Sequence, residues 1–273
     1  MQSVIISILE FLNTSMKEPQ PYASFSKGWF HYLSLALFVV VTIIIIRSMR
    51  HMNKQQLNRF LIGFSVVLLT FEVYKQIIFT YQAGGSYQWY AFPFQFCSTP
   101  MYIALIAGFA KNTRIRDSLI AFLGTFGLFA GLAVMLYPET VFITTVGINI
   151  QTMVHHGGMA AVGIALLATQ IKHSWSSILK GVIVFSILVT IAILMNTVFN
   201  TWIEQGTFNM FFINPRFENG IPILSIFQPL VSPLIFDIIY VVGFSLVASL
   251  MMGISVMLRV MFKAKIKTIL QHS

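Results

Sequence analysis

The chain has 273 residues, of which 57% are hydrophobic and only 9% are charged, and its mean hydropathy is +0.81. Soluble globular domains carry about 25% charged residues, so this composition excludes an ordinary soluble protein and indicates a membrane protein with several spans. The single cysteine, Cys97, excludes an internal disulfide and a CxxC-type metal site. The net charge of +9 does not indicate a nucleic-acid partner, because the basic residues gather in short loops between apolar segments.

Seven apolar windows predict an all-α polytopic membrane helix bundle that forms a single transmembrane domain. About 20 apolar residues are needed to cross the hydrocarbon core of a bilayer. The predicted spans are approximately 28–46, 60–79, 92–110, 117–136, 152–170, 178–198 and 233–258. Before them, residues 1–27 include the apolar stretch SVIISILEFLN, which is too short to span and lacks the basic start of a signal peptide. We expect an interfacial helix there.

The charges between the spans predict the orientation. A basic segment follows every odd-numbered span; its members are Arg47, Arg50, Lys54, Arg59, Lys111, Arg114, Arg116, Lys172, Lys180, Arg259, Lys263, Lys265 and Lys267. The segments after the even-numbered spans carry few charges, namely Glu139, Glu204, Arg216 and Glu218. The positive-inside rule therefore predicts an N-terminus outside the cell and a cytoplasmic C-terminus, with 199–232 as an external, partly membrane-associated loop.

Polar side chains inside a bilayer are costly, so each one is a functional candidate. The predicted topology places the candidates in the outer half of the bundle and leaves the inner half nearly featureless. They are Glu72, Lys75, Gln95, Cys97, Ser98, His155, His156, Asn196, Asn200 and Asp237. Any chemistry is therefore expected at the extracytoplasmic leaflet.

Each polar group also has a structural explanation. Glu72 and Lys75 are three residues apart, so they can pair on one helix face or contact a substrate headgroup. The two asparagines of the sixth span share a face and can simply bond neighbouring helices. Asp237 is harder to explain, because an unpaired carboxylate in a membrane is expensive. It is expected to pair with Arg216 or Lys75, or to orient a histidine.

The VHHGGM segment opens the fifth span with two histidines. Adjacent residues of a helix point about 100° apart, so only one of His155 and His156 can face a given partner. Gly157 and Gly158 leave room for another helix or a lipid chain. The histidines are either satisfied interfacial residues or a catalytic base. A zinc site formed with Cys97 is conceivable, but adjacent histidines are poor ligand spacing, so no metal is expected.

The FPFQFCSTPMY stretch sets the cysteine between two prolines. Pro93 suits the first turn of a helix, which predicts Cys97 near a helix N-terminus, where the dipole favours a thiolate. Pro100 cannot donate to the carbonyl of Phe96, so the helix is expected to bend beside the thiol. Cys97 is therefore a candidate nucleophile as well as a candidate packing residue.

Three stretches, FPFQFCSTPMYIALIAGF, HHGGMAAVGIALL and FNMFFINPRFENGIP, resemble the bacterial YwaF-like integral membrane proteins. That family is related to transmembrane protein 164, a eukaryotic ether-phospholipid acyltransferase, and the resemblance covers most of the chain. It implies that a cysteine early in one span takes up an acyl chain as a thioester, with help from a histidine of a later span. By position these residues are Cys97 and either His156 or His155. The asparagine of the late loop corresponds to Asn209, followed here by Met210 where the family tends to have tyrosine.

The resemblance implies a transacylase that moves a fatty acyl chain between membrane phospholipids and needs no cofactor. A neutral imidazole is a suitable base for a thiol, which can then attack a lipid ester. Ser98 and the two asparagines of the sixth span are candidate oxyanion donors, and Arg216 or Lys75 is a candidate phosphate ligand. The remaining candidate substrate-binding residues are Glu72, Gln95, Asn209 and Asp237.

Two other functions fit parts of the pattern. A permease or small-ligand receptor would use Glu72, Lys75 and Asp237 to line a polar cavity. Against it, the inner half offers almost no polar pathway, and no inverted repeat is visible. A structural or assembly partner is compatible with the small residues of the fifth span. The thioester mechanism requires the cysteine and a histidine to meet, which one chain's sequence does not determine.

Overall fold

The computed structural model describes residues 2–203 and 208–271. Glu204 and the side chains of Lys263, Lys265 and Lys267 lie outside this description. Within it the regular structure is helical apart from one isolated β-bridge between Ser15 and Thr145.

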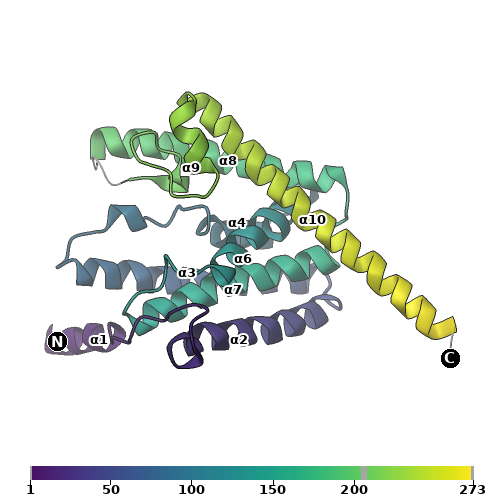
Figure 1. Ribbon diagram of the computed structural model, residues 1–273, viewed down its shortest axis with the longest axis horizontal. Coiled ribbons are helices and arrows are strands. Elements are labelled where there is room, and N and C mark those ends of the chain that lie inside the picture. Colours follow the sequence, from purple (N-terminus) through teal and green to yellow (C-terminus); the bar gives the residue numbers. More distant parts are fainter. Residues whose placement is uncertain (1, 204–207, 272–273) are drawn as a thin grey trace.

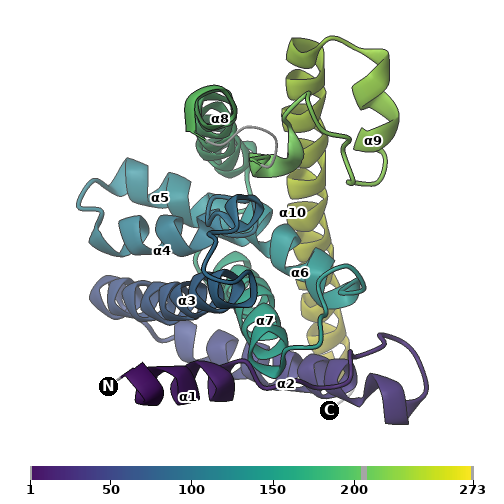
Figure 2. The same cartoon turned by 90° about the vertical axis from the view of Figure 1, so that its left-hand side faces the viewer.

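Six helical segments of the described chain are long and apolar enough to cross a bilayer. They are α2 (Phe25–Met49), α3 (Lys54–Gln82), the continuous α5–α6 unit (Thr113–Leu136), α7 (Val146–Thr169), α8 with the π-turn that follows it (Trp175–Ile203), and α10 (Pro233–Gln271). The α5–α6 unit joins α5 (Thr113–Phe122) to α6 (Leu128–Leu136) through a π-turn at Leu123–Gly127. The shorter helices are α1 (Gln2–Leu12), α4 (Thr99–Phe109) and α9 (Leu224–Phe227). Figures 1 and 2 show the long helices running roughly alongside one another, with α10 crossing the others obliquely.

Helix α7 is the centre of the bundle and contacts α2, α3, α6 and α10. Its small residues allow this, because α6 and α7 approach closely where glycines replace larger side chains. A Cβ on Gly131 of α6 would lie 2.5 Å from the carbonyl oxygen of His156, and one on Gly163 of α7 would lie 2.7 Å from Cβ of Leu128. The close approach fixes the stretch of α7 that carries the two histidines.

The third predicted span differs from the prediction. Only Thr99–Phe109 is helical, and 92–98 is irregular backbone. Eleven residues rise about 16 Å, roughly half of the hydrocarbon core of a bilayer. The described residues thus form six helices long enough to span and one half-length helix instead of the seven full spans predicted.

The prolines around the cysteine also act differently from the prediction. Pro100 lies in the first turn of α4, where its missing N–H would have no helical partner, so the expected bend at this residue is wrong. The helix-opening role expected of Pro93 belongs to Pro100. Cys97 immediately precedes Ser98, the N-cap of α4, so its expected position near a helix N-terminus is confirmed.

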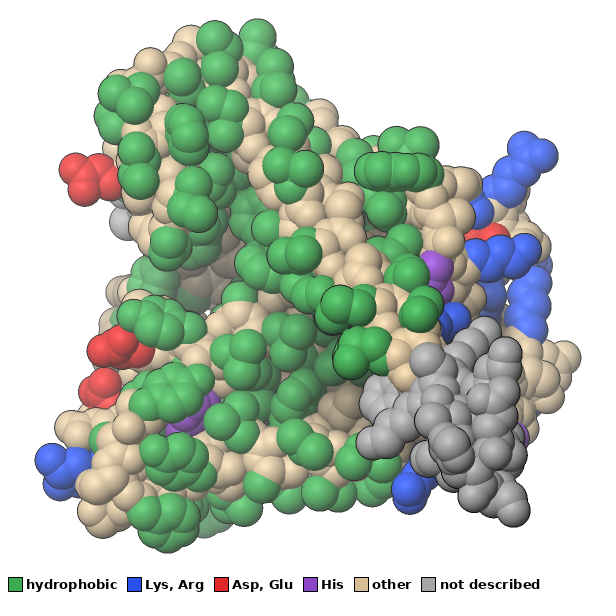
Figure 3. Space-filling view, turned by 45° about the vertical axis from the view of Figure 1, so that its right-hand side comes forward, with side chains coloured by type: hydrophobic (Ala, Val, Ile, Leu, Met, Phe, Trp, Pro, Cys, Tyr) green, Lys and Arg blue, Asp and Glu red, His purple; other side chains and the backbone are tan. Residues whose placement is uncertain are grey.

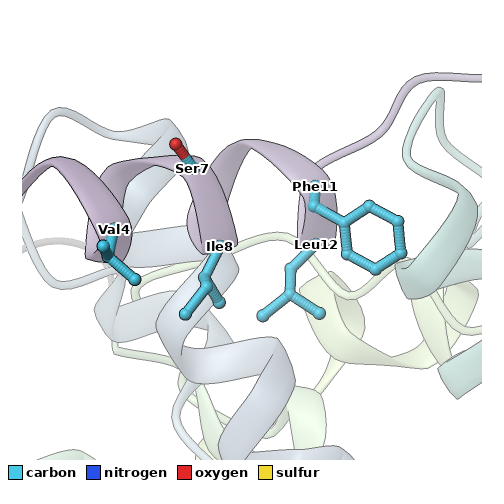
Figure 4. A pocket seen from close by; sticks show the side chains of 5 residues that line it. All are labelled: Val4, Ser7, Ile8, Phe11 and Leu12. Atoms are coloured by element: carbon cyan, nitrogen blue, oxygen red, sulfur yellow. The ribbon is translucent and has the colours of Figure 1, made fainter.

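The expected helix near the N-terminus is confirmed as α1, whereas its placement at a bilayer surface stays a prediction. Figure 4 shows Val4, Ile8 and Leu12 projecting from the same side of α1, beside a hollow of about 580 Å³. The chain after α1 is tied to the segment before α7, because Met16 N donates to Thr144 O (2.7 Å) and Val146 N donates to Thr14 O (3.0 Å).

The two ends of the bundle differ in charge. Figure 3 shows most of the Lys and Arg side chains of that face at the end near the C-terminus, while acidic side chains mark the opposite end. The loops after α2, α4 and α7 lie at one end of the bundle, because Gly108 near the end of α4 packs against Asn58 near the start of α3, and Gln170 after α7 bonds the carbonyl of Met49 at the end of α2. We call this end the basic end and the opposite end the acidic end.

Candidate functional site

A cavity of about 330 Å³ lies between α3, the irregular segment before α4, and α7. We call it the cysteine cavity. The lining residues that the sequence predicts as functional candidates are Glu72, Lys75, Cys97, Ser98, His155 and His156. The structure therefore brings the cysteine and both histidines, which are 58 and 59 positions apart from it in the sequence, to one site. Of the two imidazoles, that of His155 contacts the segment that leads into α4, and both line the same cavity as Cys97.

The cysteine lies deep along the bundle axis. His155 is nine residues from the start of α7, and Glu72 is ten residues from the end of α3, which places both about 14 to 15 Å from the acidic end of their helices. Cys97 stands about 16 Å from the other end of α4. Irregular backbone at such a depth is tolerated where it is buried in protein or lines a cavity, and 97–98 lines one.

His155 is bonded to the cysteine's own backbone. Its Nε2 lies 2.9 Å from the carbonyl oxygen of Cys97. A carbonyl only accepts, so Nε2 carries the hydrogen and Nδ1 is left as a bare acceptor. That Nδ1 is buried without a hydrogen-bond partner.

His156 has the opposite tautomer. Its Nδ1 lies 2.8 Å from the carbonyl oxygen of Thr152, one helical turn earlier, so Nδ1 donates and Nε2 is bare. This Nε2 is also buried without a partner. The two imidazole centroids are 5.3 Å apart, and each ring offers an unprotonated nitrogen. Among the described residues no group of three or more His, Cys, Asp or Glu side chains is arranged to hold a metal ion.

Glu72 and Lys75 form the ion pair that their spacing predicts, with Nζ of Lys75 2.8 Å from Oε1 of Glu72. Gln76 Nε2 donates to the same carboxylate oxygen (2.7 Å) and to the carbonyl of Ala91 (2.8 Å). This pair forms a polar wall of the cysteine cavity. Gln76 was missed as a site residue, although its position four residues after Glu72 was a usable signal.

Gln95 connects the cysteine segment to the late loop. Its Nε2 donates to the carbonyl of Asn209 (3.0 Å), and its Oε1 accepts from the backbone N–H of Phe211 (2.9 Å). Phe211 and Phe212 have φ of 60° and 57°, a strained left-handed conformation for aromatic residues. Asn209 Oδ1 accepts from the backbone N–H of Asn214 (3.0 Å) and closes the same loop. In this structure Gln95 and Asn209 shape the loop.

The other predicted residues gather at a second cavity of about 290 Å³, between the end of α8, the late loop and the start of α10. We call it the arginine cavity; its polar lining residues are Asn196, Thr197, Asn200, Thr201, Asn214, Arg216 and Asp237. The structure thus separates these candidates from Cys97. Asp237 does not share a cavity with the histidines, so the expectation that it orients one of them is not met.

The amides of the arginine cavity are largely occupied. Asn196 donates to the carbonyl of Met210 (3.0 Å) and accepts from its N–H (2.7 Å). Asn200 Nδ2 donates to the carbonyls of Asn196 (2.6 Å) and Phe208 (2.7 Å), which uses both of its hydrogens. These two asparagines thus have a structural role, but their partners are the late loop and their own helix instead of the neighbouring helices that were expected.

Asp237 forms no ion pair with Arg216 or Lys75 in the described structure. Lys75 pairs with Glu72, and the other ion pair of the described residues joins Lys180 to Asp117. The pairing expected for Asp237 is therefore not found.

Six long apolar helices, with the charged loops gathered at their ends, define a multi-pass membrane protein. The chain belongs to the TMEM164 family, whose match covers residues 24–256 and so runs from the residue before α2 into α10. The family-level resemblance is confirmed, while the match does not establish the YwaF-like name. Searches of curated proteins and of solved structures found no match.

Proposed function

We propose that the protein is a thiol-dependent acyltransferase that moves a fatty acyl chain between membrane lipids through a thioester at Cys97. The observation that carries the proposal is the cysteine cavity, where Cys97 shares one chamber with two buried imidazoles that each have a bare nitrogen. The TMEM164 family is associated with ether-lipid acyltransferase activity, which supports the same reaction class.

In the proposed first step, Nε2 of His156 takes the proton of Cys97 Sγ. The thiolate attacks the ester carbonyl carbon of a donor lipid, so a C–S bond forms and the ester C–O bond breaks. The departing lipid alkoxide takes the proton from His156 and leaves as a lysolipid. In the second step His156 accepts the proton of an acceptor lipid hydroxyl, whose oxygen attacks the thioester; the thiolate leaves and is reprotonated by His156.

We assign His155 a positioning role. Its N–H bond to the carbonyl of Cys97 holds the irregular segment against α7 and so sets the place of the thiol. This leaves His156, whose only ring bond is to its own helix, as the more available base.

The oxyanion of each step needs hydrogen-bond donors near the thiol. Ser98 is buried and makes no side-chain capping bond to α4, so its hydroxyl is not occupied by that role. The positive end of the α4 dipole lies at the same place, while the N–H groups of Thr99 and Met101 already donate to the carbonyls of Gln95 and Ser98. Preorganised donors of this kind often supply the largest part of catalysis. We therefore transfer the oxyanion role from Asn196 and Asn200 to the hydroxyl of Ser98, supported by the dipole of α4.

The rest of the cysteine cavity suits a lipid ester. Lys75 supplies a cation for a phosphate, balanced by Glu72, while Phe79, Ile143 and Ile148 supply apolar walls. The cavity belongs to the half of the bundle at the acidic end. The positive-inside rule makes that end extracytoplasmic, so we place the reaction in the outer leaflet.

The decisive experiment uses the purified protein and a phospholipid with a tagged acyl chain. We expect hydroxylamine-labile label on the protein together with lysolipid, and neither from Cys97→Ala. The double variant Cys97→Ala/Ser86→Cys is a matched control, because it moves the only cysteine to an exposed position after α3 at the acidic end. Label that survives Cys97→Ala, or equal label on the displaced cysteine, or a wild-type protein that forms neither product, would contradict the proposal.

A further inference from the structure

The arginine cavity is separate from the site of the proposed reaction and carries its own charges. We propose that it binds the headgroup of a phospholipid with a primary ammonium, a phosphoethanolamine group, with the phosphate at Arg216 and the ammonium at Asp237. The inference goes beyond acyl transfer, because it concerns a second lipid site whose occupancy does not depend on Cys97.

The position of the cavity fits a headgroup. It is formed where α8 ends and α10 begins, at the same acidic end of the bundle, and a headgroup lies at such an end of a membrane protein. Its volume of about 290 Å³ is close to the lower end of the range of roughly 300–1,000 Å³ typical of ligand sites.

Arg216 is placed to bind an anion. Its Nη1 donates to the carbonyl of Asn200 (3.0 Å) and its backbone N–H donates to Oδ1 of Asn214 (3.0 Å), so the residue is held at two points. A guanidinium has five N–H donors, and the others remain for a ligand. Arginine matches phosphate oxygens in a bidentate fashion.

Asp237 and Asn200 are placed to accept hydrogen bonds from a cation. Asp237 is half-buried on α10, lines the cavity, and has no basic nitrogen of the described residues within 4.0 Å. Asn200 lines the same cavity and is 2% exposed, and its Oδ1 has no hydrogen-bond partner. A carboxylate and an amide oxygen left without donors are costly to bury, and a ligand ammonium would satisfy both.

The lining also selects the type of ammonium. Quaternary ammonium groups are bound by aromatic side chains, and none of the described residues that line this cavity is aromatic. A primary ammonium offers N–H donors, which suit oxygen acceptors. The cavity therefore fits phosphoethanolamine better than phosphocholine, and a zwitterion better than a simple anion.

The test measures lipid binding by native mass spectrometry on full-length Cys97→Ala protein in detergent, titrated with phosphatidylethanolamine. Because this variant has no thiol, failure of the acyl-transfer proposal leaves the measurement unaffected. We expect Arg216→Gln and Asp237→Asn each to weaken binding about tenfold or more, as the loss of a charge-assisted bond predicts. Arg216→Lys keeps the charge and loses the bidentate geometry, so its affinity should lie between those of the wild type and Arg216→Gln. Matched controls are Arg114→Gln and Glu218→Gln, exposed charges outside the cavity, which should change nothing.

Competing ligands define the chemistry. Phosphatidylcholine and phosphatidylglycerol should each bind about tenfold more weakly than phosphatidylethanolamine, and free O-phosphoethanolamine or inorganic phosphate should not displace the lipid at equal concentration. Equal binding of phosphatidylglycerol with no effect of Asp237→Asn would overturn the zwitterion assignment. Equal binding of phosphatidylcholine would overturn the choice of ammonium. Displacement by the free headgroup would show a soluble ligand and overturn a lipid site, as would binding unaltered in both cavity variants.

Discussion

The cysteine cavity and the arginine cavity belong to the same end of the bundle and have similar volumes, about 330 and 290 Å³, but they leave different atoms unpaired. The cysteine cavity leaves bare imidazole nitrogens on His155 and His156. In the arginine cavity the donors of Asn200 are used by the protein's own backbone, and a guanidinium and a carboxylate remain. Proton acceptors beside a thiol suit chemistry, whereas fixed opposite charges suit binding.

One loop is bonded both to the segment that leads to Cys97 and to the wall of the arginine cavity. Gln95, two residues before Cys97, bonds the backbone of Asn209 and Phe211. Asn196 bonds the backbone of Met210, which lies between them. The strained φ angles of the two phenylalanines are held by these bonds. We therefore expect the two cavities to function independently, although both depend on this loop for their structure.

The largest expected effect is on the proposed base. His156→Ala should slow thioester formation by about 100- to 10,000-fold, the usual contribution of a general base, and leave phosphatidylethanolamine binding unchanged. The rate of tagged-acyl transfer to the protein measures it. His51→Ala, an exposed histidine at the basic end, is the control and should keep full activity. If Arg216→Gln abolished the transfer as completely as His156→Ala, the division between the two cavities would fail.

A smaller effect is expected at the ion pair of the cysteine cavity. Glu72→Gln removes the carboxylate that pairs with the mostly buried ammonium of Lys75. The variant should lose up to about 3 kcal/mol of stability, measured as a lower Tm in detergent. Asp117→Asn breaks the Lys180–Asp117 pair, which is longer and more exposed, and should cost about 0–1 kcal/mol. Equal losses of stability in the two variants would show that the Glu72–Lys75 pair is as accessible to water as the exposed Lys180–Asp117 pair.

A loss of stability of similar size, with only a modest effect on activity, is expected in the shared loop. Gln95→Ala leaves the N–H of Phe211 and the carbonyl of Asn209 unsatisfied, which should cost about 1–3 kcal/mol of stability and weaken both activities modestly. Thermal unfolding, acyl transfer and lipid binding should be measured on one preparation. Gln88→Ala is the control, because Gln88 bonds only to its neighbour Ser86. A loss confined to one function would contradict the loop's role as a shared support.

The sequence predicts most of the helical architecture because hydropathy reports on burial in lipid, and six of the predicted spans are long helices. The third span shows the limit of that signal, since the apolar residues of 92–98 line a protein interior without forming a helix. Hydropathy does not distinguish a full helix from a half-length one. The prolines indicate where a helix can begin, and Pro100 marks the observed start of α4.

The sequence identifies most of the site residues, although it missed Gln76, and it does not predict that they divide between two cavities. Each costly polar residue was identifiable because the bilayer penalises it, and the pairing of Glu72 with Lys75 followed from helical spacing. That α7 packs at the centre, and carries the histidines to Cys97, depends on contacts between distant segments such as Gly131 against α7. The separation of Asn200, Arg216 and Asp237 from the thiol depends on the same helix order, which no local pattern encodes.

The half-length of α4 also bears on the lifetime of an acylated cysteine. Cys97 stands about 16 Å from the basic end of α4, and His155 beside it stands about 14 Å from the acidic end of α7, so a thioester there would lie inside the bundle, below the membrane surface. Bulk water reaches such a point only through the cavity, so hydrolysis, the reaction that competes with transfer, would be slowed. A broken span in this position would let the protein hold an activated acyl group until a lipid acceptor arrives from the same bilayer.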